Sequence, residues 1–227
     1  MVLQKIVEFF APAECLGCGF RGDLICGTCL DAIQTAPKQC YGCRLSNNTN
    51  DSCEICRRRL PLSSLAVAAD YDGVLREVVL ALKNKHARSA AKPLGNLLAR
   101  TLADKANKAA EEVDLVTWVP VSPARRRDRG YNQAELIARR VARSLGLSAA
   151  PTLGRVTSLH QTGAKRADRL AQVAGGFYPT RRVDGRRVLL VDDVVTTGAT
   201  VDECARTLLA AGAREVRGAA VARHLSN

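Results

Sequence analysis

Two adjacent carboxylates, Asp192 and Asp193, stand where an apolar run gives way to hydroxyl-bearing residues in the stretch VLLVDDVVTTGAT, which ends at Thr200. An isolated buried carboxylate is costly, so such a pair is typically solvated at the end of an element or held for a ligand. The pattern predicts a strand over 188–191, then a turn, then a helix from Thr200 onward. Free backbone N–H groups and the dipole of that helix make the turn a suitable site for a phosphate group.

The side chains of this stretch add the other groups that a sugar phosphate needs. Thr196, Thr197 and Thr200 offer hydroxyl donors, and Gly198 lets the backbone approach the anion closely. The two aspartates can accept hydrogen bonds from vicinal hydroxyls, so the whole stretch predicts a ribose 5-phosphate site. The alternative is that Asp193 and the threonines only cap the helix, because Asp and Thr are preferred capping residues.

Eight of the nine cysteines form four Cys-x-x-Cys pairs, and each pair can present two thiolates to one metal ion. Two pairs make a four-cysteine tetrahedral site of the kind that structural zinc accepts. The spacing favours sequential pairing into two sites, and interleaved pairing stays open. The predicted ligands are Cys15, Cys18, Cys26 and Cys29 for one site, and Cys40, Cys43, Cys53 and Cys56 for the other. A disulfide framework and an iron–sulfur cluster are the alternatives. The ninth cysteine, Cys204, falls in a helical pattern and is expected in the core.

Charge and cysteine usage divide the 227 residues in two. We expect a cysteine-rich zinc-binding module over 1–60 and a larger domain over 61–227. Residues 1–60 hold seven Lys/Arg and six Asp/Glu; subtraction from 34 and 22 leaves 27 and 16 for 61–227, a balance of +11. This charge suits an anionic partner, either a phosphorylated small molecule or a nucleic acid. A solvated basic surface with no dedicated partner is the alternative.

The chain shows no sign of a membrane or secretion segment. No apolar run approaches the length that spans a bilayer, and the N-terminal residues lack the regions of a secretion signal. We therefore expect a cytoplasmic protein without membrane insertion.

Beyond residue 60, short apolar runs alternate with helical periodicity. We expect strands over 66–71, 114–121 and 214–222, and helices over 73–85, 94–110, 132–146 and 200–213. With the strand that leads to Asp192, this alternation predicts an α/β fold with a parallel sheet covered by helices on both faces. In such folds the ligand lies beyond the carboxyl ends of the strands. Two polar loops, 192–199 and 123–133, should meet there with the turn after Tyr71.

Taken in order along the chain, the motifs resemble those of the ComF/GntX-like family. VLLVDDVVTTGAT resembles the ribose-phosphate signature of type I phosphoribosyltransferases, whose donor is phosphoribosyl pyrophosphate (PRPP). The cysteine pairs, a KNK segment, VPVSPARRRDRGYNQAELIA and a later Gln…Arg segment precede it, as they do in that family. The resemblance covers nearly the whole chain. It implies a type I phosphoribosyltransferase-like sheet, preceded by a double zinc-ribbon-like module, in a protein associated with competence for DNA uptake.

The resemblance also implies roles for individual residues. The candidate catalytic residues, acting with Mg²⁺, are Lys83, Arg129, Asp192 and Asp193. The implied PRPP-binding residues are Asp192, Asp193, Val194, Val195, Thr196, Thr197, Gly198, Ala199, Thr200, Lys83, Asn84 and Lys85. The residues implied to face the pyrophosphate, the acceptor or a flap are Arg125, Arg126, Arg127, Tyr131, Asn132, Gln133, Gln161 and Arg169. In the flap segment the family usually has Arg-x-x-Asn. This chain has Arg169 at the first position of that motif and Gln172 where the family has asparagine.

Three functions are compatible with these features. The first is a PRPP-dependent pentosyltransferase that transfers phosphoribose to an acceptor which the sequence does not identify. The second is a catalytically silent, PRPP-responsive protein that holds single-stranded DNA on its basic surface. The third is an adaptor whose zinc module docks a helicase or a recombination mediator.

Overall fold

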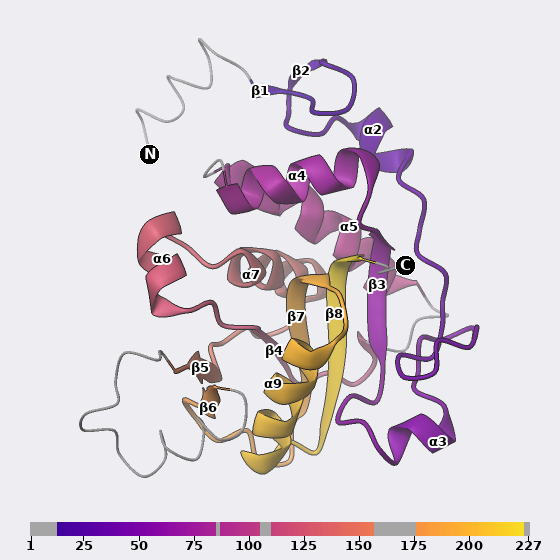
Figure 1. The fold of residues 1–227 in the computed structure, drawn as a ribbon, viewed down its shortest axis with the longest axis vertical. Coiled ribbons are helices and arrows are strands. Elements are labelled where there is room, and N and C mark those ends of the chain that lie inside the picture. Colours follow the sequence, from indigo (N-terminus) through magenta and orange to yellow (C-terminus); the bar gives the residue numbers. More distant parts are fainter. Residues whose placement is uncertain (1–12, 85–86, 105–109, 157–175, 225–227) are drawn as a thin grey trace.

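In the computed structural model, which describes residues 13–84, 87–104, 110–156 and 176–224, a four-stranded parallel sheet lies at the centre (Figure 1). Its strands, in spatial order, are β3 (Leu65–Asp70), β8 (Glu215–Arg223), β7 (Arg187–Val195) and β4 (Leu115–Trp118). Continuous apolar runs form these strands because a parallel sheet is buried on both faces. The predicted strand over 114–121 is shorter than expected, since regular pairing with β7 ends at Trp118.

Helices cover both faces of the sheet, as the alternating pattern predicts. One face packs against α4 (Gly73–Asn84), α5 (Ala91–Ala103) and α7 (Gln133–Leu145), with the short 3-10 turn η1 (Arg88–Ala90) between α4 and α5. The other face packs against α9 (Ala199–Ala210). The helix expected over 94–110 ends at Ala103, because Asp104 takes an extended conformation. Among the described residues, no helix has both the length and the apolar character that crossing a bilayer requires.

Strand β7 extends beyond the apolar run 188–191, and this corrects the expectation that the two carboxylates follow the end of the strand. Pairing with β4 ends at Val191, but pairing with β8 continues as far as Val195. The carboxylates therefore lie within the strand and not after it. Because β7 outruns β4, Asp192 and Asp193 have no strand beside them on that edge, which leaves room for a cavity.

The arginine-rich segment expected as a loop contains a helix, α6 (Pro123–Arg129). Ser122 caps it by accepting a hydrogen bond from the N–H of Arg125 at 3.3 Å, and Pro123 occupies its first turn. Gly130 ends it in the left-handed conformation, at φ +77°. These start and stop residues override the charge repulsion among the arginines, so α6 stands as a short basic helix at one side of the sheet (Figure 1).

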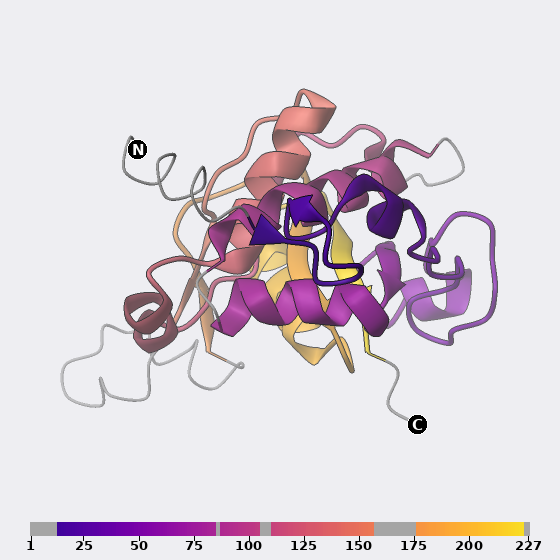
Figure 2. The same cartoon turned by 90° about the horizontal axis from the view of Figure 1, so that it is seen from above.

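The cysteine-rich segment, residues 13–60, runs along the β3 side of the molecule (Figures 1 and 2). It contains β1 (Ala13–Glu14), β2 (Arg21–Gly22), α2 (Gly27–Asp31) and α3 (Glu54–Arg57). Its chain forms antiparallel bridges to the outer edge of β3, Thr35 to Ala69 and Asp51 to Ser64. This pairing covers an edge strand that would otherwise expose unpaired backbone groups.

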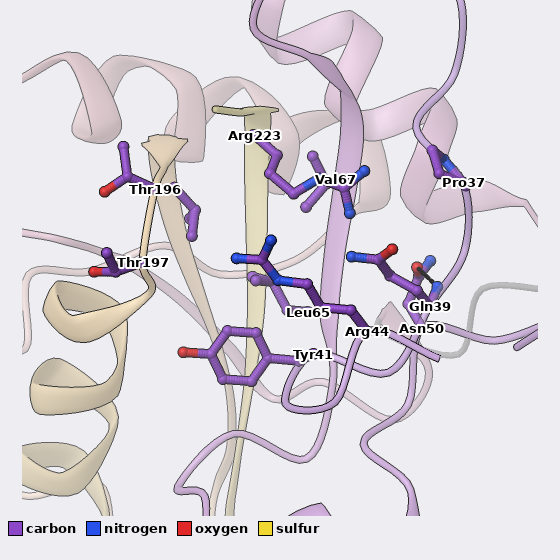
Figure 3. A pocket seen from close by; sticks show the side chains of 11 residues that line it. Pro37, Gln39, Tyr41, Arg44, Asn50, Leu65, Val67, Thr196, Thr197 and Arg223 are labelled. Atoms are coloured by element: carbon purple, nitrogen blue, oxygen red, sulfur yellow. Dashed lines mark hydrogen bonds between the residues drawn. The ribbon is translucent and has the colours of Figure 1, made fainter. Parts of the chain in front are cut away.

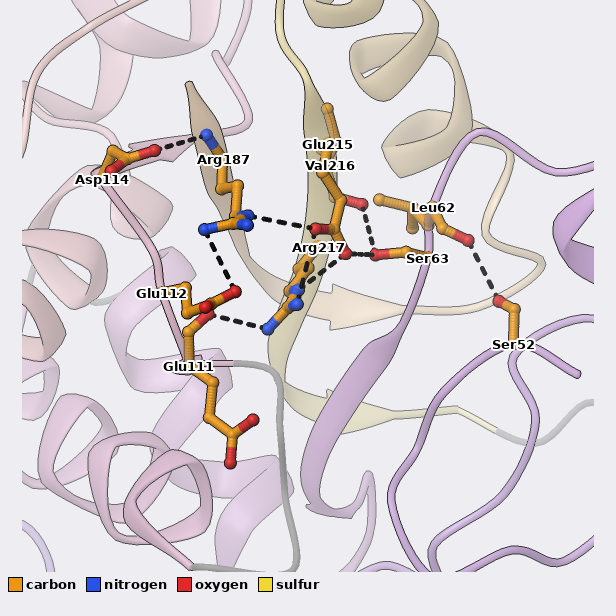
Figure 4. Close-up of polar contacts among 10 residues, drawn as sticks. All are labelled: Ser52, Leu62, Ser63, Glu111, Glu112, Asp114, Arg187, Glu215, Val216 and Arg217. Atoms are coloured by element: carbon orange, nitrogen blue, oxygen red, sulfur yellow. Dashed lines mark hydrogen bonds and ion pairs between the residues drawn. The ribbon is translucent and has the colours of Figure 1, made fainter. Parts of the chain in front are cut away.

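The amino ends of the strands form a closed polar network (Figure 4). Arg187 pairs with Glu112 at 3.1 Å, and Arg217 pairs with Glu215 at 2.8 Å. Ser63, which precedes β3, donates a hydrogen bond to the same Glu215 at 2.6 Å. Charged groups at this end of the sheet thus satisfy one another, and the open cavity lies at the opposite end.

Candidate donor-binding site

A cavity of about 360 Å³ opens at the carboxyl ends of β4 and β7. Its walls come from the end of α4, from α6, from the start of α7, from β5 (Leu153–Arg155) and from β7. Two of the three polar segments expected to meet here do so, while the third, the turn after Tyr71, contributes no residue to the lining of this cavity.

The two carboxylates in this cavity are held differently. Asp193 forms an ion pair with Lys83 at 3.2 Å, and its Oδ1 accepts a hydrogen bond from the N–H of Val194 at 2.7 Å. Asp192 accepts one from the N–H of Asp193 at 2.9 Å. Burial, together with the charge of Asp193, raises the pKa of Asp192 well above its ordinary value, and Lys83 offsets this only in part. The free protein therefore keeps Asp192 in an environment that disfavours its charge.

Cations outnumber carboxylates on the cavity wall. Lys83, Arg125, Arg129 and Arg155 stand against Asp192 and Asp193, an excess of two positive charges. Arg155 lies 5.2 Å from the ring centroid of Phe177 in the neighbouring strand β6 (Phe177–Pro179), a cation–π contact that holds the arginine against the wall. This excess of positive charge favours a ligand that carries negative charge.

The turn between β7 and α9 has the geometry of an anion cradle. Gly198 is the N-cap of α9 with φ +86°, a left-handed conformation that favours glycine. Beside it, the hydroxyl of Thr197 accepts a hydrogen bond from the N–H of Ala199 at 3.4 Å. The capping alternative holds only in part. Asp193 does not cap the helix, since it is bonded to Lys83 and to Val194, but Thr197 bonds to the first N–H of α9. The residues from Val194 to Val201 line a small hollow beside Asp192.

Two buried amides at the start of α7 face the cavity. Asn132 donates from Nδ2 to the carbonyl of Val119 at 2.9 Å, which leaves its Oδ1 without a partner, and the Nε2 of Gln133 is also unpartnered. Both residues are 2% exposed and line the cavity. Buried polar atoms are normally bonded, so these two are suited to contact a ligand.

The remaining predicted residues lie at or beyond the edge of the cavity. Tyr131 is buried away from it, with its hydroxyl donating to the carbonyl of Leu82 at 2.7 Å. Arg126 pairs with Glu135 at 3.4 Å, and Asn84 and Arg127 are exposed. Lys85, Gln161 and Arg169 lie outside the described residues. Arg155 was not among the predicted residues, because a lone arginine in a three-residue strand carries no recognisable sequence pattern.

The eight paired cysteines form two compact clusters that could hold metal ions. Within each, all four sulfur atoms lie within 4.8 Å of one another, and the groupings confirm sequential pairing. The clusters share a local pattern, since the N–H of Cys26 points to the sulfur of Cys15 at 3.3 Å and that of Cys53 to Cys40 at 3.2 Å.

These N–H groups favour the thiolate form of the buried cysteine in each cluster. Burial opposes ionisation of Cys15 and Cys40, but the backbone hydrogen bonds outweigh it and lower the pKa of each to about 6. Such thiolates are the form that ligates metal. Cys204, in contrast, is fully buried in α9 as predicted, and burial raises its pKa.

The chain is similar in sequence to several named proteins. A family model described as phosphoribosyl transferase domain matches residues 132–227. The DNA utilization protein YhgH of Escherichia coli K12 is 31% identical over 199 residues, which cover 85% of this chain and 87% of that protein. Competence protein ComFC of Bacillus subtilis is 28% identical over 200 residues, covering 77% and 79%.

Two further similarities cover smaller parts of the chain. Competence protein F of Haemophilus influenzae is 33% identical over 107 residues, which cover 44% of this chain and 45% of that protein. Among solved structures, the allosteric regulatory enzyme of purine biosynthesis overlaps with a TM-score of 0.42 at 26% identity, covering 60% of this chain and 25% of that one. The family match, the parallel sheet and the two cysteine clusters together confirm the predicted fold class.

The unfavourable charge of Asp192 predicts a stability effect. A raised pKa in the folded state means that stability is lost as pH rises above the ordinary value of 3.8. Asp192→Asn removes the charge and keeps the oxygen that accepts from Asp193. At neutral pH it should raise the melting temperature by about 2–4 °C, the shift that roughly 1 kcal/mol produces in a chain of this size. Scanning calorimetry from pH 4 to 8 measures it, and the gain should shrink toward pH 4.

A matched control is Asp184→Asn. Its exposed carboxylate pairs with Arg182 at 2.6 Å, which lowers the pKa of Asp184, so this change should be neutral or slightly destabilising at pH 7. If Asp192→Asn destabilised the free protein at pH 7, the description of Asp192 as an electrostatically strained group would be wrong.

Proposed function

This chain belongs to the ComF-like family of phosphoribosyltransferase-domain proteins, and from that premise we propose that its cavity binds PRPP with Mg²⁺ and transfers the phosphoribosyl group to an acceptor. One arrangement supports this most: a carboxylate pair at the end of β7, beside a helix-terminal turn and opposite a wall of cations. These are the groups that ribose hydroxyls, a 5-phosphate and a pyrophosphate require.

Each part of the donor has a complementary part of the site. Asp192 and Asp193 accept hydrogen bonds from the ribose hydroxyls, and the backbone N–H groups from Val195 to Thr200 take the 5-phosphate. Lys83, Arg129 and Arg155 face the pyrophosphate, and Arg125 lies beside them. Carboxylate oxygens suit Mg²⁺, which in such a site neutralises phosphate charge.

The reaction then needs positioning and charge stabilisation and no side-chain nucleophile. The bond between ribose C1 and the pyrophosphate oxygen breaks, and its electron pair leaves with pyrophosphate. The acceptor supplies a lone pair to C1 and loses its proton to solvent or to the leaving group. Lys83 and the arginines stabilise the charge that develops on the departing oxygen. The unpartnered amide atoms of Asn132 and Gln133 can orient either partner.

Calorimetry tests the donor assignment. Wild-type protein should bind PRPP in the presence of Mg²⁺. The double variant Asp192→Asn/Asp193→Asn should bind at least about 100-fold more weakly, because it loses two charged hydrogen-bond acceptors. Asp184→Asn, which alters an exposed carboxylate elsewhere, should bind as wild type does. No binding by wild type would sink the assignment.

Turnover is a separate question from binding. A transferase releases pyrophosphate when a suitable acceptor is added, so a panel of bases, nucleosides and nucleotides can be screened for its release. A protein that binds PRPP and releases none with any acceptor is the silent, PRPP-responsive alternative.

We propose that each cysteine cluster holds a structural zinc ion. Tetrahedral zinc with bonds of about 2.3 Å separates its sulfurs by roughly 3.8 Å. The distances of 3.6 Å from Cys18 to Cys26 and 3.8 Å from Cys43 to Cys53 fit that geometry. Four thiolates leave no open position, so the role is structural.

Metal analysis should find two zinc ions per chain purified under reducing conditions. Cys18→Ser/Cys26→Ser should lower the content by one, since two of the four sulfurs of the first cluster are lost. Iron with visible absorbance would contradict the zinc assignment, as would a thiol titration showing that the cysteines form disulfides.

The names of the relatives suggest a place for this activity. YhgH is named for DNA utilization, and ComFC and competence protein F for competence. We propose that this chain acts in the cytoplasm on incoming DNA or its nucleotides, with a helicase or a recombination mediator as a partner. The exposed arginines of α6 favour a further role in binding single-stranded DNA.

Salt dependence tests that DNA role. If α6 contacts the backbone, the logarithm of the binding constant should fall with the logarithm of salt concentration by about 0.7 per phosphate contacted. Arg127→Gln, which does not alter the cavity lining, should reduce the slope by about that amount. Arg206→Gln on α9 is the control and should leave the slope unchanged. A slope near zero for wild type would argue against a basic DNA-binding surface.

A further inference from the structure

A side chain from the second cysteine cluster contacts the turn that precedes α9. Tyr41 stands between the ligands Cys40 and Cys43, and its ring extends from the cysteine-rich segment toward the start of α9 (Figure 3). Its hydroxyl donates to Oδ1 of Asp202 at 2.8 Å and lies 3.3 Å from the carbonyl oxygen of Gly198. This contact joins residues 161 and 157 positions apart.

The ring of Tyr41 packs against Gly198, which has a left-handed conformation. A Cβ atom there would lie 2.2 Å from the hydroxyl oxygen of Tyr41 and 2.9 Å from its ring, so the ring occupies the space next to the glycine Cα. Within the turn itself the N–H of Ala199 donates to the hydroxyl of Thr197 at 3.4 Å, whereas Tyr41 approaches the turn from the cysteine-rich segment. Tyr41 therefore restricts the conformation of the backbone that carries the N–H groups of the cradle.

The hydrogen bond also controls a negative charge. Asp202 lies in the first turn of α9, where its carboxylate competes with a bound phosphate for the positive end of the helix dipole. Tyr41 thus holds the carboxylate on the side of the cysteine-rich segment, and Asp202 lines neither the main cavity nor the cradle.

The position of Tyr41 depends in turn on the second cluster. Cys40 is 1% exposed, and a side chain at Gly42 would come within 2.7 Å of the sulfur of Cys56 and 2.6 Å of Leu60. The backbone on both sides of Tyr41 is therefore wrapped closely around the sulfur atoms. Loss of the metal would free the segment that carries the ring.

We propose that Tyr41 is a positioning residue for the donor's 5-phosphate, and that metal in the second cluster and PRPP in the cavity strengthen each other's binding through it. This proposal rests on the proposed function, because it assumes that the cradle takes the phosphate. The first cluster serves as an internal comparison. Its Gly17 packs against Val74 of α4, and none of the described contacts of its cysteines reaches the cradle.

Tyr41→Phe is the direct test, because it keeps the ring and removes only the hydroxyl. PRPP with Mg²⁺ should bind this variant about two- to fivefold more weakly than wild type, because the released carboxylate of Asp202 competes with the phosphate for the positive end of the helix dipole. Zinc content should stay at the wild-type level. Tyr178→Phe, on β6 away from the cradle, is the matched control and should bind as wild type does.

The reciprocal measurement separates positioning from a merely structural role. At equilibrium with a competing chelator, saturating PRPP should raise the metal affinity of the second cluster. Thermodynamic linkage requires that metal in this cluster raise the affinity for PRPP by the same factor. The effect should disappear from the second cluster in Tyr41→Phe and persist when Cys18→Ser/Cys26→Ser disables the first.

The outcomes are distinct. If wild type binds PRPP and Tyr41→Phe binds it equally well, the coupling is wrong and the proposed function stands. If Tyr41→Phe lowers the melting temperature but leaves PRPP affinity and metal competition unchanged, the contact is only structural and the proposal fails. If wild type does not bind PRPP at all, the proposed function and this proposal fall together.

Discussion

The last four residues of strand β7, from Asp192 to Val195, extend beyond the part of the strand that pairs with β4. The rest of the site depends on this overhang. An unpaired strand edge leaves a space that helices cannot fill. Into that space come Lys83 from α4, the amides at the start of α7 and the arginine of β5. Without the overhang, a neighbouring strand would bury both carboxylates and no ligand could reach them.

Electrostatics then shapes the two ends of the sheet differently. At the amino ends, Arg187, Glu112 and Glu215 compensate one another (Figure 4). At the carboxyl ends the charges are unbalanced, since four cations face two carboxylates and Asp192 resists ionisation. This excess of positive charge favours an anionic ligand, as expected of a functional site. The cysteine-rich segment adds a second layer, because it covers the open edge of β3 and reaches the cradle through Tyr41.

Local patterns predicted much of this molecule. The run DDVVTTGAT gave the strand, turn and helix in the right order, and the cysteine spacing gave the right grouping, because both depend on neighbours in the chain. The helix α6 was missed because its arginines obscured the signals at Ser122, Pro123 and Gly130. The length of β7 depends on its partner β8, and the places of Arg155 and Tyr41 depend on residues far away in sequence. No pattern within one stretch could predict these, and the roles of the individual site residues remain predictions.

The central claim is that the end of β7 and the start of α9 together hold a ribose phosphate. A crystal structure of the protein with PRPP and Mg²⁺ tests it most directly. The account predicts ribose hydroxyls within hydrogen-bond distance of Asp192 and Asp193, and the 5-phosphate against the N–H groups from Val195 to Thr200. Clear density for PRPP at any other place, with the carboxylates uncontacted, would contradict it.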